Sequence, residues 1–260
     1  PGGYVAAIRL GQLGLKTAIV ERGDLGGVCL NWGCIPSKAY INAAKIIEHI
    51  ETAGEIGILG GGETKVDMGK LKTWKDGVVK RLTDGIGFLL EKNGVTILRG
   101  DASFVDANTL SLKGEKGTTQ VGFDQAIIAT GSRSLEIPPF PYDGENVLNS
   151  RHMLAMTEVP ENLVVIGGGV IGLEMGMYMS RFGSKVSVVE MMPQVLPGTD
   201  AQLVKTLSRS LKKRGIKVHT ETKALGFSGS KGKLEVEIED KKGKKSQLPA
   251  SKILVSIGRR

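Results

Sequence analysis

The pattern of apolar and polar positions predicts an α/β protein, and it is clearest in the second half of the chain. Residues 163–166 form a continuous apolar run, which is typical of a strand buried on both faces of a parallel sheet. A Gly-x-Gly-x-x-Gly run follows at 167–172, then a helical pattern up to Phe182 and a strand at 185–189 that ends on Glu190. This order of strand, glycine turn, helix, strand and acid predicts a dinucleotide-binding unit.

Each part of this motif has a physical reason. Glycines permit a tight turn and let a pyrophosphate approach the backbone at the positive N-terminus of the helix. Glu190 follows Gly172 by 18 residues, where a carboxylate accepts a hydrogen bond from the ribose 2′-hydroxyl and repels a 2′-phosphate. Met191 and Met192 follow it in place of arginines, so NAD is favoured over NADP. The alternative for Glu190 is an ordinary carboxylate at the end of a strand.

The start of the chain repeats the same spacing. Gly3 is followed by Gly14 after 11 residues and by Glu21 after 18, which are the separations found in the second half. A helix at 4–13 and a strand at 16–20 complete the repeat. Two such units predict two bound dinucleotides. Because the leading glycines and the first strand of this repeat are missing, we expect the chain to be a fragment.

The predicted fold is a pair of tandem Rossmann-like domains, 1–142 and 143–260. Each is expected to be a three-layer α/β domain with a parallel sheet and small antiparallel excursions. A proline-rich linker at 137–142 separates them, and a buried strand is expected at 125–129. The remaining predicted elements are two helices and three strands, at 37–52, 68–91, 95–98, 110–112 and 120–123.

The formal charge of +8 at pH 7 is only a weak indication of nucleic-acid binding. Much of the excess lies at 231–245, where alternating apolar residues and a lysine-rich turn predict a solvated hairpin. No aromatic residues interleave with these lysines, so bases would find no stacking platform. The chain also has no uncharged apolar stretch of about 18 residues. We therefore expect neither nucleic acid nor a membrane as a partner.

Cys29 and Cys34 are the only cysteines, which excludes the disulfide-rich scaffold of small secreted proteins. On a regular helix, residues five apart are separated by about 8 Å, beyond the limit of about 7 Å for a disulfide. A bridge therefore needs a distorted turn, for which Gly33 and Pro36 provide a break and a restart. We expect helix N-terminal amides and nearby Lys38 to lower a thiol pKa. These features favour a redox-active dithiol that exchanges electrons.

Two other interpretations of the cysteine pair remain open, half of a zinc site and an inert buried pair. The spacing fits the zinc range, but the chain has no further cysteine, and its three histidines are scattered at 49, 152 and 219. We expect no bound metal.

The segment 26–38, Gly-Gly-Val-Cys-Leu-Asn-Trp-Gly-Cys-Ile-Pro-Ser-Lys, resembles the active-site segment of the flavin-dependent pyridine nucleotide–disulfide oxidoreductases. Four further segments match the same family, at 129–132, 167–174, 189–190 and 257–260, so the resemblance covers the whole chain. Within the family, the form of 29–38 is most similar to the members that oxidise dihydrolipoamide.

This resemblance implies two cofactors, FAD and NAD, and a role for each reactive side chain. Cys29 is implied to be the outer thiol that exchanges with lipoamide, and Cys34 the inner thiol that lies against the flavin and forms a charge-transfer complex with it. Lys38 is implied to lie near the flavin N5 atom. Glu174 is implied to lie near the nicotinamide and the flavin; the alternative from sequence is a solvent-facing helix residue.

The resemblance also implies which residues line the cofactors. Those expected to contact FAD are Gly3, Glu21, Gly27, Lys38, Ala102, Thr130, Gly131 and Ser132. Those expected to contact NAD are Gly167, Gly169, Gly172, Glu174, Glu190, Ala224 and Gly258.

The implied reaction is oxidation of protein-bound dihydrolipoamide with reduction of NAD⁺. The implied partners are a lipoylated protein of 2-oxo acid dehydrogenase complexes or of glycine cleavage, and a second subunit in a homodimer. The family's general acid/base pair belongs to a dimerisation domain outside these 260 residues. The expected compartment is the cytoplasm, or the mitochondrial matrix in a eukaryote. The alternatives are a related mercuric or other disulfide reductase, a transhydrogenase, and a nucleotide-binding fragment without activity.

Overall fold

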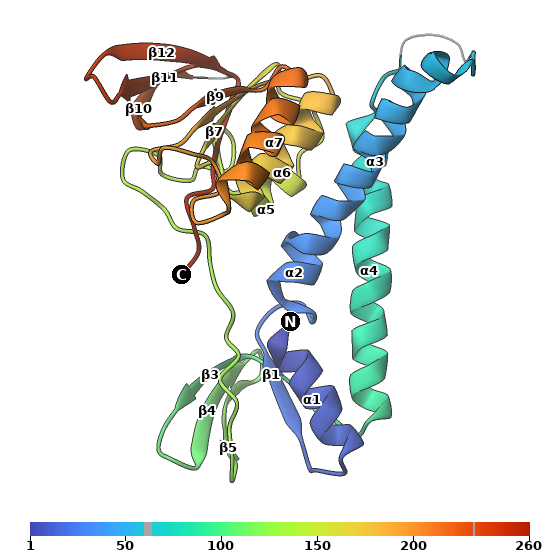
Figure 1. Cartoon of the computed structure of the whole chain (residues 1–260). Coiled ribbons are helices and arrows are strands. Elements are labelled where there is room, and N and C mark those ends of the chain that lie inside the picture. Colours follow the sequence, from blue (N-terminus) through green and yellow to red (C-terminus); the bar gives the residue numbers. More distant parts are fainter. Residues whose placement is uncertain (60–63, 231) are drawn as a thin grey trace. The chain divides into compact units, whose positions relative to one another are not determined.

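The computed structural model of the chain describes residues 1–59, 64–230 and 232–260. Two compact units are present: one comprises Pro1–Ile35 and Asp76–Ser132, and the other comprises Pro36–Lys75 and Arg133–Arg260 (Figure 1). The units differ in extent from the two predicted domains, because residues 36–75 and 133–142 belong to the second unit. The predicted helices and most of the predicted strands are confirmed to within three residues at each end.

The first unit is built around a short parallel sheet in which β1 (Ala18–Glu21) pairs with β2 (Thr96–Arg99). Apolar side chains from its helices and strands form one core cluster, which includes Ala7, Leu30 and Leu90. A separate antiparallel sheet has the order β3-β4-β5. The other elements that contribute to this unit are α1 (Gly2–Gln12), α2 (Gly27–Trp32), α4 (Met68–Lys92), β3 (Asp101–Phe104), β4 (Thr109–Gly114) and β5 (Gly117–Gly122).

The predicted buried strand at 125–129 is wrong. This segment has no regular secondary structure, and Ile127 and Ile128 are 64% and 72% exposed. Within the described ranges, β1 and β2 form a sheet of two strands, and no strand pairs with residues 125–129. An apolar run becomes a buried strand only where neighbouring strands accept and donate its backbone hydrogen bonds, so the sequence pattern alone is not sufficient.

The second unit contains a five-stranded sheet with the order β6-β13-β7-β8-β9, in which every neighbouring pair is parallel. Alternate residues of β7 face opposite sides: Leu163 and Val165 pack among the helices, whereas Val164 and Ile166 pack against the second sheet of this unit. The strands of the parallel sheet are β6 (Val147–Leu148), β7 (Asn162–Ile166), β8 (Lys185–Val189), β9 (Lys217–His219) and β13 (Lys252–Val255).

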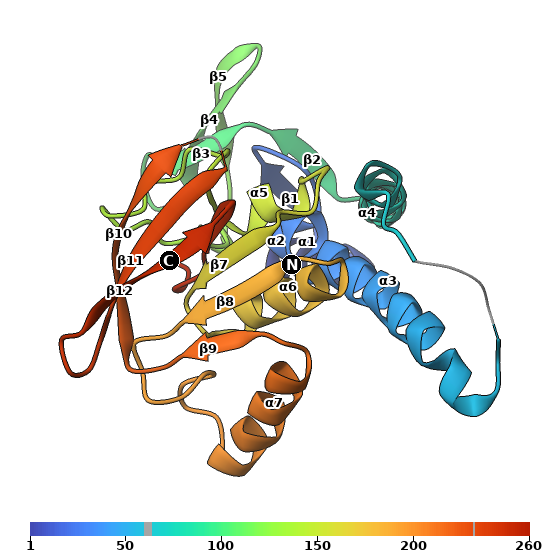
Figure 2. The ribbon, with the colours of Figure 1, turned by 90° about the horizontal axis from the view of Figure 1, so that it is seen from above.

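The other two layers of the second unit lie on the two faces of this parallel sheet (Figure 2). One layer holds the helices α5 (Ser150–Leu154), α6 (Val170–Arg181) and α7 (Ala201–Lys213). The other is an antiparallel sheet of β10 (Thr222–Ser230), β11 (Lys233–Asp240) and β12 (Lys245–Ala250). The predicted hairpin is thus confirmed for β11 and β12, where Leu234, Val236 and Ile238 are buried; residue 231 lies outside the described residues.

The predicted linker at 137–142 is not an exposed connection. Phe140 is fully buried and stacks on Phe227 with ring centroids 5.8 Å apart. The hydroxyl of Tyr142 donates a hydrogen bond to the carbonyl of Leu135. The prolines of this segment favour an exposed turn, but burial of the two aromatic rings contributes more to the free energy of folding than this local preference does. The segment is therefore part of the core of the second unit.

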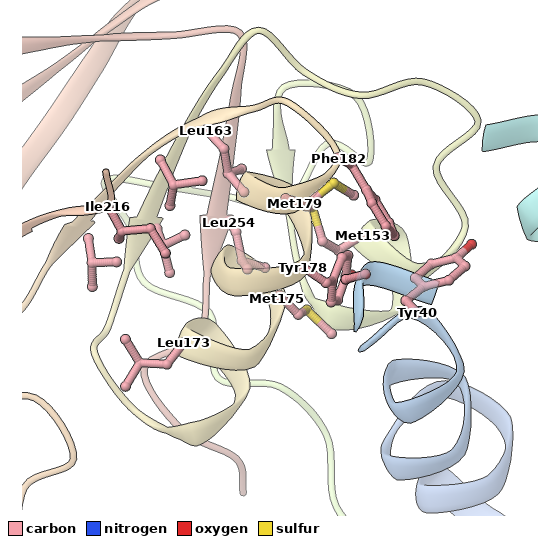
Figure 3. Packing of buried hydrophobic residues seen from close by; sticks show 14 of the residues in the cluster. Tyr40, Met153, Leu163, Leu173, Met175, Tyr178, Met179, Phe182, Ile216 and Leu254 are labelled. Atoms are coloured by element: carbon pink, nitrogen blue, oxygen red, sulfur yellow. The ribbon is translucent and has the colours of Figure 1, made fainter. Parts of the chain in front are cut away.

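Helix α3 (Cys34–Thr52) continues into a short 3-10 turn, η1 (Ala53–Ile56), and its residues from Pro36 onward pack on the helical layer of the second unit. Tyr40 is fully buried and meets Tyr178 of α6 edge to face, with ring centroids 5.3 Å apart (Figure 3). Phe182 contacts both rings. Such aromatic contacts add about 1 kcal/mol each beyond the burial of apolar area. Across the described residues, no helix is both long enough and apolar enough to span a membrane.

The far end of α3 is held by a cluster of charges. Arg181 donates hydrogen bonds to Glu48 and to Glu51, and Arg214 donates to both carboxylate oxygens of Glu48. Burial by itself would raise the pKa of Glu48, but the hydrogen bonds and positive charges of Arg214 and then Arg181 outweigh it and lower that pKa below its ordinary value. The ionised carboxylate therefore stabilises the folded chain.

Replacing Glu48 by Gln should reduce the free energy of unfolding by about 1 kcal/mol at pH 7, because two arginines lose their charged partner. Since the folded-state pKa is lowered, this contribution is present above the unfolded-state pKa and is lost as the pH falls through the folded-state value. Urea titrations followed by circular dichroism should therefore show a smaller difference between wild type and variant at pH 3 than at pH 7. A difference that is independent of pH would contradict this account.

Candidate functional site

The glycine turn of the second unit connects the end of β7 to the start of α6. A Cβ atom at Gly172 would lie 2.4 Å from Oγ of Ser256 and 2.5 Å from the carbonyl oxygen of Gly167, so only glycine fits there. Ser256 Oγ in turn lies 3.3 Å from that same carbonyl oxygen. At Gly169 a Cβ atom would meet nothing within 4 Å, because this residue borders open space. The turn therefore packs tightly on its inner side and is accessible on its outer side.

A cavity of about 680 Å³ lies at this turn, at the carboxyl ends of the parallel strands. Its size is typical of a small-molecule site, and its position is where doubly wound sheets bind their ligands. The residues predicted from sequence to contact NAD that line this cavity are Gly167, Gly169, Glu190, Ala224 and Gly258. Gly172 and Glu174 do not line it: Gly172 packs beneath the turn, and Glu174 lies one helical turn further along α6.

Glu190 is held in place by two backbone amides. Its Oε2 accepts a hydrogen bond of 2.7 Å from the amide of Gly168, and its Oε1 accepts one of 2.8 Å from the amide of Met192. The residue is only 8% exposed. Each carboxylate oxygen keeps a second lone pair, so the group can still accept from a ligand hydroxyl at the cavity. This geometry differs from that of a freely solvated carboxylate at the end of a strand.

Lys38 and Glu174 form an ion pair. Nζ of Lys38 lies 2.8 Å from both carboxylate oxygens of Glu174, which joins the first turns of α3 to α6. The side chain of Glu174 is only 23% exposed. It is therefore not the solvent-facing helix residue that was the alternative from sequence. The sequence placed both residues near the same cofactors but gave no sign that they pair. That contact depends on how α3 packs on α6, which no local pattern encodes.

The two cysteines lie at a break between helices. Helix α2 ends at Trp32, Gly33 leaves helical geometry with φ −136° and ψ −118°, and α3 begins at Cys34. A Cβ atom at Gly33 would lie 2.9 Å from the carbonyl oxygen of Val28, so a side chain would push the two helices apart. The predicted break is confirmed. Both cysteines are free thiols in this structure, and Cys34 is the more exposed of the two.

A hydrogen bond joins the side chains of Cys29 and Cys34. Burial raises the pKa of the Cys29 thiol above its ordinary value, and the hydrogen bond and negative charge of Cys34 raise it further. A backbone hydrogen bond at Cys34 lowers the pKa of Cys29, as expected for a local amide, but burial and the Cys34 side chain raise that pKa by more. The ammonium of Lys38 is engaged by Glu174, and two adjacent thiols resist the loss of a second proton.

The residues predicted to contact FAD in the first unit are only partly brought together. A Cβ atom at Gly3 would lie 3.4 Å from Cβ of Ala129, and one at Gly27 would lie 2.8 Å from the nitrogen of Pro1. The start of α1 thus lies beside the start of α2 and beside the segment that leads into Thr130, Gly131 and Ser132. Glu21 ends β1, and its Oε1 accepts from the amide of Gly23 at 2.9 Å. Ala102 lies in β3, where it pairs with Leu112.

Some residues at the cavity were missed by the sequence analysis. Ser256 and Arg259 line it, and Arg259 Nη1 lies 3.4 Å from Oγ of Ser134. A usable signal was present, because Ser256 directly follows the apolar run of β13 and residues at the carboxyl ends of parallel strands meet at one edge of the sheet. In the part of the chain that the structure describes, no group of three or more His, Cys, Asp and Glu residues could hold a metal ion.

The fold and the site define the class of protein: an α/β protein that combines a glycine turn of the dinucleotide-binding type with a pair of neighbouring cysteines. The model of the family described as pyridine nucleotide-disulphide oxidoreductase matches residues 1–260, and the chain belongs to this family. Proteins named dihydrolipoyl dehydrogenase from Bacillus subtilis (strain 168) and Geobacillus stearothermophilus are each 44% identical to the whole of this chain. The alignments cover 55% of each relative, so the chain spans about half the length of the curated relatives it matches.

Solved structures show the same fold. LpdA from Mycobacterium tuberculosis superimposes with a TM-score of 0.89 at 23% identity, covering 100% of this chain and 57% of that one. The flavoprotein disulfide reductase RclA from Escherichia coli, solved as a Cu(II) complex, gives 0.83 at 24% identity, covering 100% of this chain and 54% of that one. At these identities the likeness establishes the α/β architecture with Rossmann-like domains and nothing more specific.

Substitution of Gly172 by Ala should destabilise the second unit by about 2 kcal/mol, because the methyl group collides with backbone and Ser256. The matched control is Gly169→Ala in the same turn, which should change stability by less than about 0.5 kcal/mol because nothing lies near the new atom. Urea titration measures both values. Equal losses for the two variants would contradict the packing described for the turn.

Removal of the Cys34 side chain should lower the pKa of Cys29, because its hydrogen bond and its negative charge both raise that pKa. In the reduced Cys34→Ala variant, we expect Cys29 to react faster with iodoacetamide near pH 8, because a larger fraction of it is then thiolate. Alkylation rates across a pH series measure this, with Cys29→Ala as the control for background labelling. A rate profile for Cys29 unchanged by the substitution would contradict the coupling of the two thiols.

Proposed function

We propose that this chain is the electron-transfer part of a flavoprotein that oxidises protein-bound dihydrolipoamide and reduces NAD⁺ through Cys29 and Cys34. The observation that carries the proposal is the hydrogen-bonded thiol pair at the break between α2 and α3. Relatives named dihydrolipoyl dehydrogenase, 44% identical over the whole chain, support the choice of substrate. The assignment of 1–142 to FAD and 143–260 to NAD is part of this proposal.

The residues present fit the two cofactors that the proposal requires. For NAD, the open side of the glycine turn leaves room for a pyrophosphate at the start of α6, and the fixed carboxylate of Glu190 provides an acceptor for a ribose hydroxyl. For FAD, the start of α1 and Glu21 offer the corresponding elements in the first unit. Bound FAD would supply two-electron transfer between the thiols and the nicotinamide.

In the proposed reaction, a thiolate of the substrate attacks the sulfur of Cys29 in the oxidised, disulfide form of the pair. The new mixed disulfide forms as the Cys29–Cys34 bond breaks, and the electron pair leaves on Cys34. The second thiol of the substrate then attacks the substrate sulfur of this mixed disulfide. The ring of lipoamide closes, and Cys29 leaves as a thiol. Cys34 is the first residue of α3, where helix N-terminal amides favour negative charge on a leaving group.

Lys38 and Glu174 contribute fixed charge to this arrangement. Lys38 follows Cys34 by four residues in α3, and the ion pair holds its ammonium against Glu174 of α6. We propose that the pair sets the electrostatic environment of the flavin and nicotinamide rings when these are bound. A pair of opposite charges changes the net charge of the site less than either residue alone would.

The proposal includes the partners and the compartment. The substrate would be carried by a lipoylated protein of a 2-oxo acid dehydrogenase complex or of glycine cleavage. The complete protein would act as a homodimer, whose other subunit supplies the acid/base group. Its expected location is the cytoplasm, or the mitochondrial matrix of a eukaryote.

The direct test uses the complete protein loaded with FAD, with dihydrolipoamide and NAD⁺ as substrates, and follows NADH absorbance. Replacement of either Cys29 or Cys34 by Ser should reduce kcat by roughly a thousandfold, because the disulfide can no longer form. The control is His49→Gln, an exposed change near the end of α3, which should leave kcat unchanged.

Other outcomes of this experiment would overturn parts of the proposal. Turnover that survives the Cys34→Ser change would exclude the dithiol as the electron carrier. Turnover of mercuric ion or another disulfide, with none of dihydrolipoamide, would be consistent with the family but would reject dihydrolipoamide as the substrate. If the complete protein cannot be loaded with FAD, it would be a nucleotide-binding module and not an enzyme.

A further inference from the structure

The methionines of this chain fall into groups of very different exposure. Of the eight in the sequence, four are buried to 3% exposure or less. Two more, Met156 and Met177, are partly buried against the same core. Met191 and Met192 are 64% and 48% exposed. The four buried ones are Met68, Met153, Met175 and Met179.

The two exposed methionines lie at the cavity of the second unit. Both line it, and both directly follow Glu190. The amide of Met192 donates to Glu190 Oε1 at 2.8 Å, and its carbonyl accepts from the amide of Glu221 at 3.0 Å. The backbone is therefore fixed on both sides of Met192, and the thioether side chains are held between the cavity and solvent.

The loop that carries these methionines is also anchored to the glycine turn. The amide of Leu196 donates to the carbonyl of Gly168 at 2.8 Å, and Leu196 has a positive φ of 48°. Val195 is 2% exposed, and a Cβ atom at Gly168 would lie only 2.9 Å from its side chain. A chemical change at Met191 or Met192 cannot be relieved easily by movement of the loop, because the loop and the turn share these contacts.

Thioethers that are exposed to water react with hydroperoxides. An S–O bond forms as the O–O bond of the peroxide breaks, so the methionine sulfur is oxidised by two electrons and hydrogen peroxide is reduced to water. The product is a polar, chiral sulfoxide in place of a flexible apolar side chain. At this cavity the change would place a strong dipole beside Glu190, in a part of the lining that otherwise presents apolar thioethers.

We propose that Met191 and Met192 form an oxidation-sensitive site, at which hydroperoxides convert the thioethers to sulfoxides and thereby weaken binding of a dinucleotide in the cavity. The inference rests on the proposed binding of NAD there. It adds a modification that acts on the nucleotide end of the electron path and is chemically separate from oxidation of Cys29 and Cys34.

The test uses the complete protein and ADP-ribose, the part of NAD that cannot take up electrons. The protein is treated with hydrogen peroxide and then with dithiothreitol. Dithiothreitol reduces cysteine disulfides and sulfenic acids back to thiols but leaves methionine sulfoxide in place. Peptide mass spectrometry should show sulfoxide at Met191 and Met192 at least about tenfold faster than at Met153 or Met175, following exposure. Calorimetry should show that ADP-ribose binds about fivefold more weakly after treatment.

A double variant, Met191→Leu with Met192→Leu, separates this effect from general damage. Leucine keeps the apolar volume but has no sulfur. The affinity of this variant for ADP-ribose should be the same before and after peroxide, whatever its starting value. The buried control Met175→Leu should lose affinity on treatment as the wild type does, and methionine sulfoxide reductases should restore it in both.

Two results would overturn the inference while leaving the proposed function intact. One is equal oxidation of exposed and buried methionines. The other is loss of ADP-ribose affinity in the double leucine variant that matches the loss in wild type. If untreated protein fails to bind ADP-ribose at all, the proposed NAD site is wrong, and the oxidation site is rejected with it.

Discussion

The packing of α3 on α6 is the constraint on which the proposed chemistry depends. At one end Lys38 reaches both carboxylate oxygens of Glu174, and at the other Arg181 reaches Glu48. Between Lys38 and Glu48 in the sequence of α3, the ring of Tyr40 packs edge to face against Tyr178 and Phe182 (Figure 3). These contacts hold the part of α3 from Pro36 onward on α6, which begins at the glycine turn, within the second unit. A lateral shift of one helical turn would break both ion pairs at once.

A second constraint is close backbone contact at two glycines. Gly33 allows α2 and α3 to meet at an angle that keeps Cys29 and Cys34 within hydrogen-bonding reach, and Gly172 allows α6 to approach the end of β7 and Ser256, which follows β13. In both places a single methyl group would collide with a backbone oxygen. The polar groups at these sites are then satisfied locally, as the carboxylate of Glu190 is by two amides. The close backbone contacts at Gly33 and Gly172 thus fix the positions from which the cysteine pair and Glu190 present their side chains.

The features that could be predicted from sequence are those set by neighbouring residues. The strand, glycine turn, helix and strand around Gly172 follow from local pattern, as does the break at Gly33. The strand expected at 125–129 failed because its burial depends on pairing partners, which a local pattern does not report. The Lys38–Glu174 contact could not be foreseen for the same reason. The raised pKa of Cys29 depends on burial and on its neighbour's charge, and both follow from the folded structure.

In the proposed reaction, electrons pass between a pyridine nucleotide and the thiols of Cys29 and Cys34. An anaerobic titration of the complete, FAD-loaded protein with NADH, with free thiols counted at each step, measures this transfer. We expect one dithiol to appear for each NADH consumed, and peptide mapping to assign the new thiols to Cys29 and Cys34. Consumption of NADH with reduction of the flavin but no new thiols would contradict it.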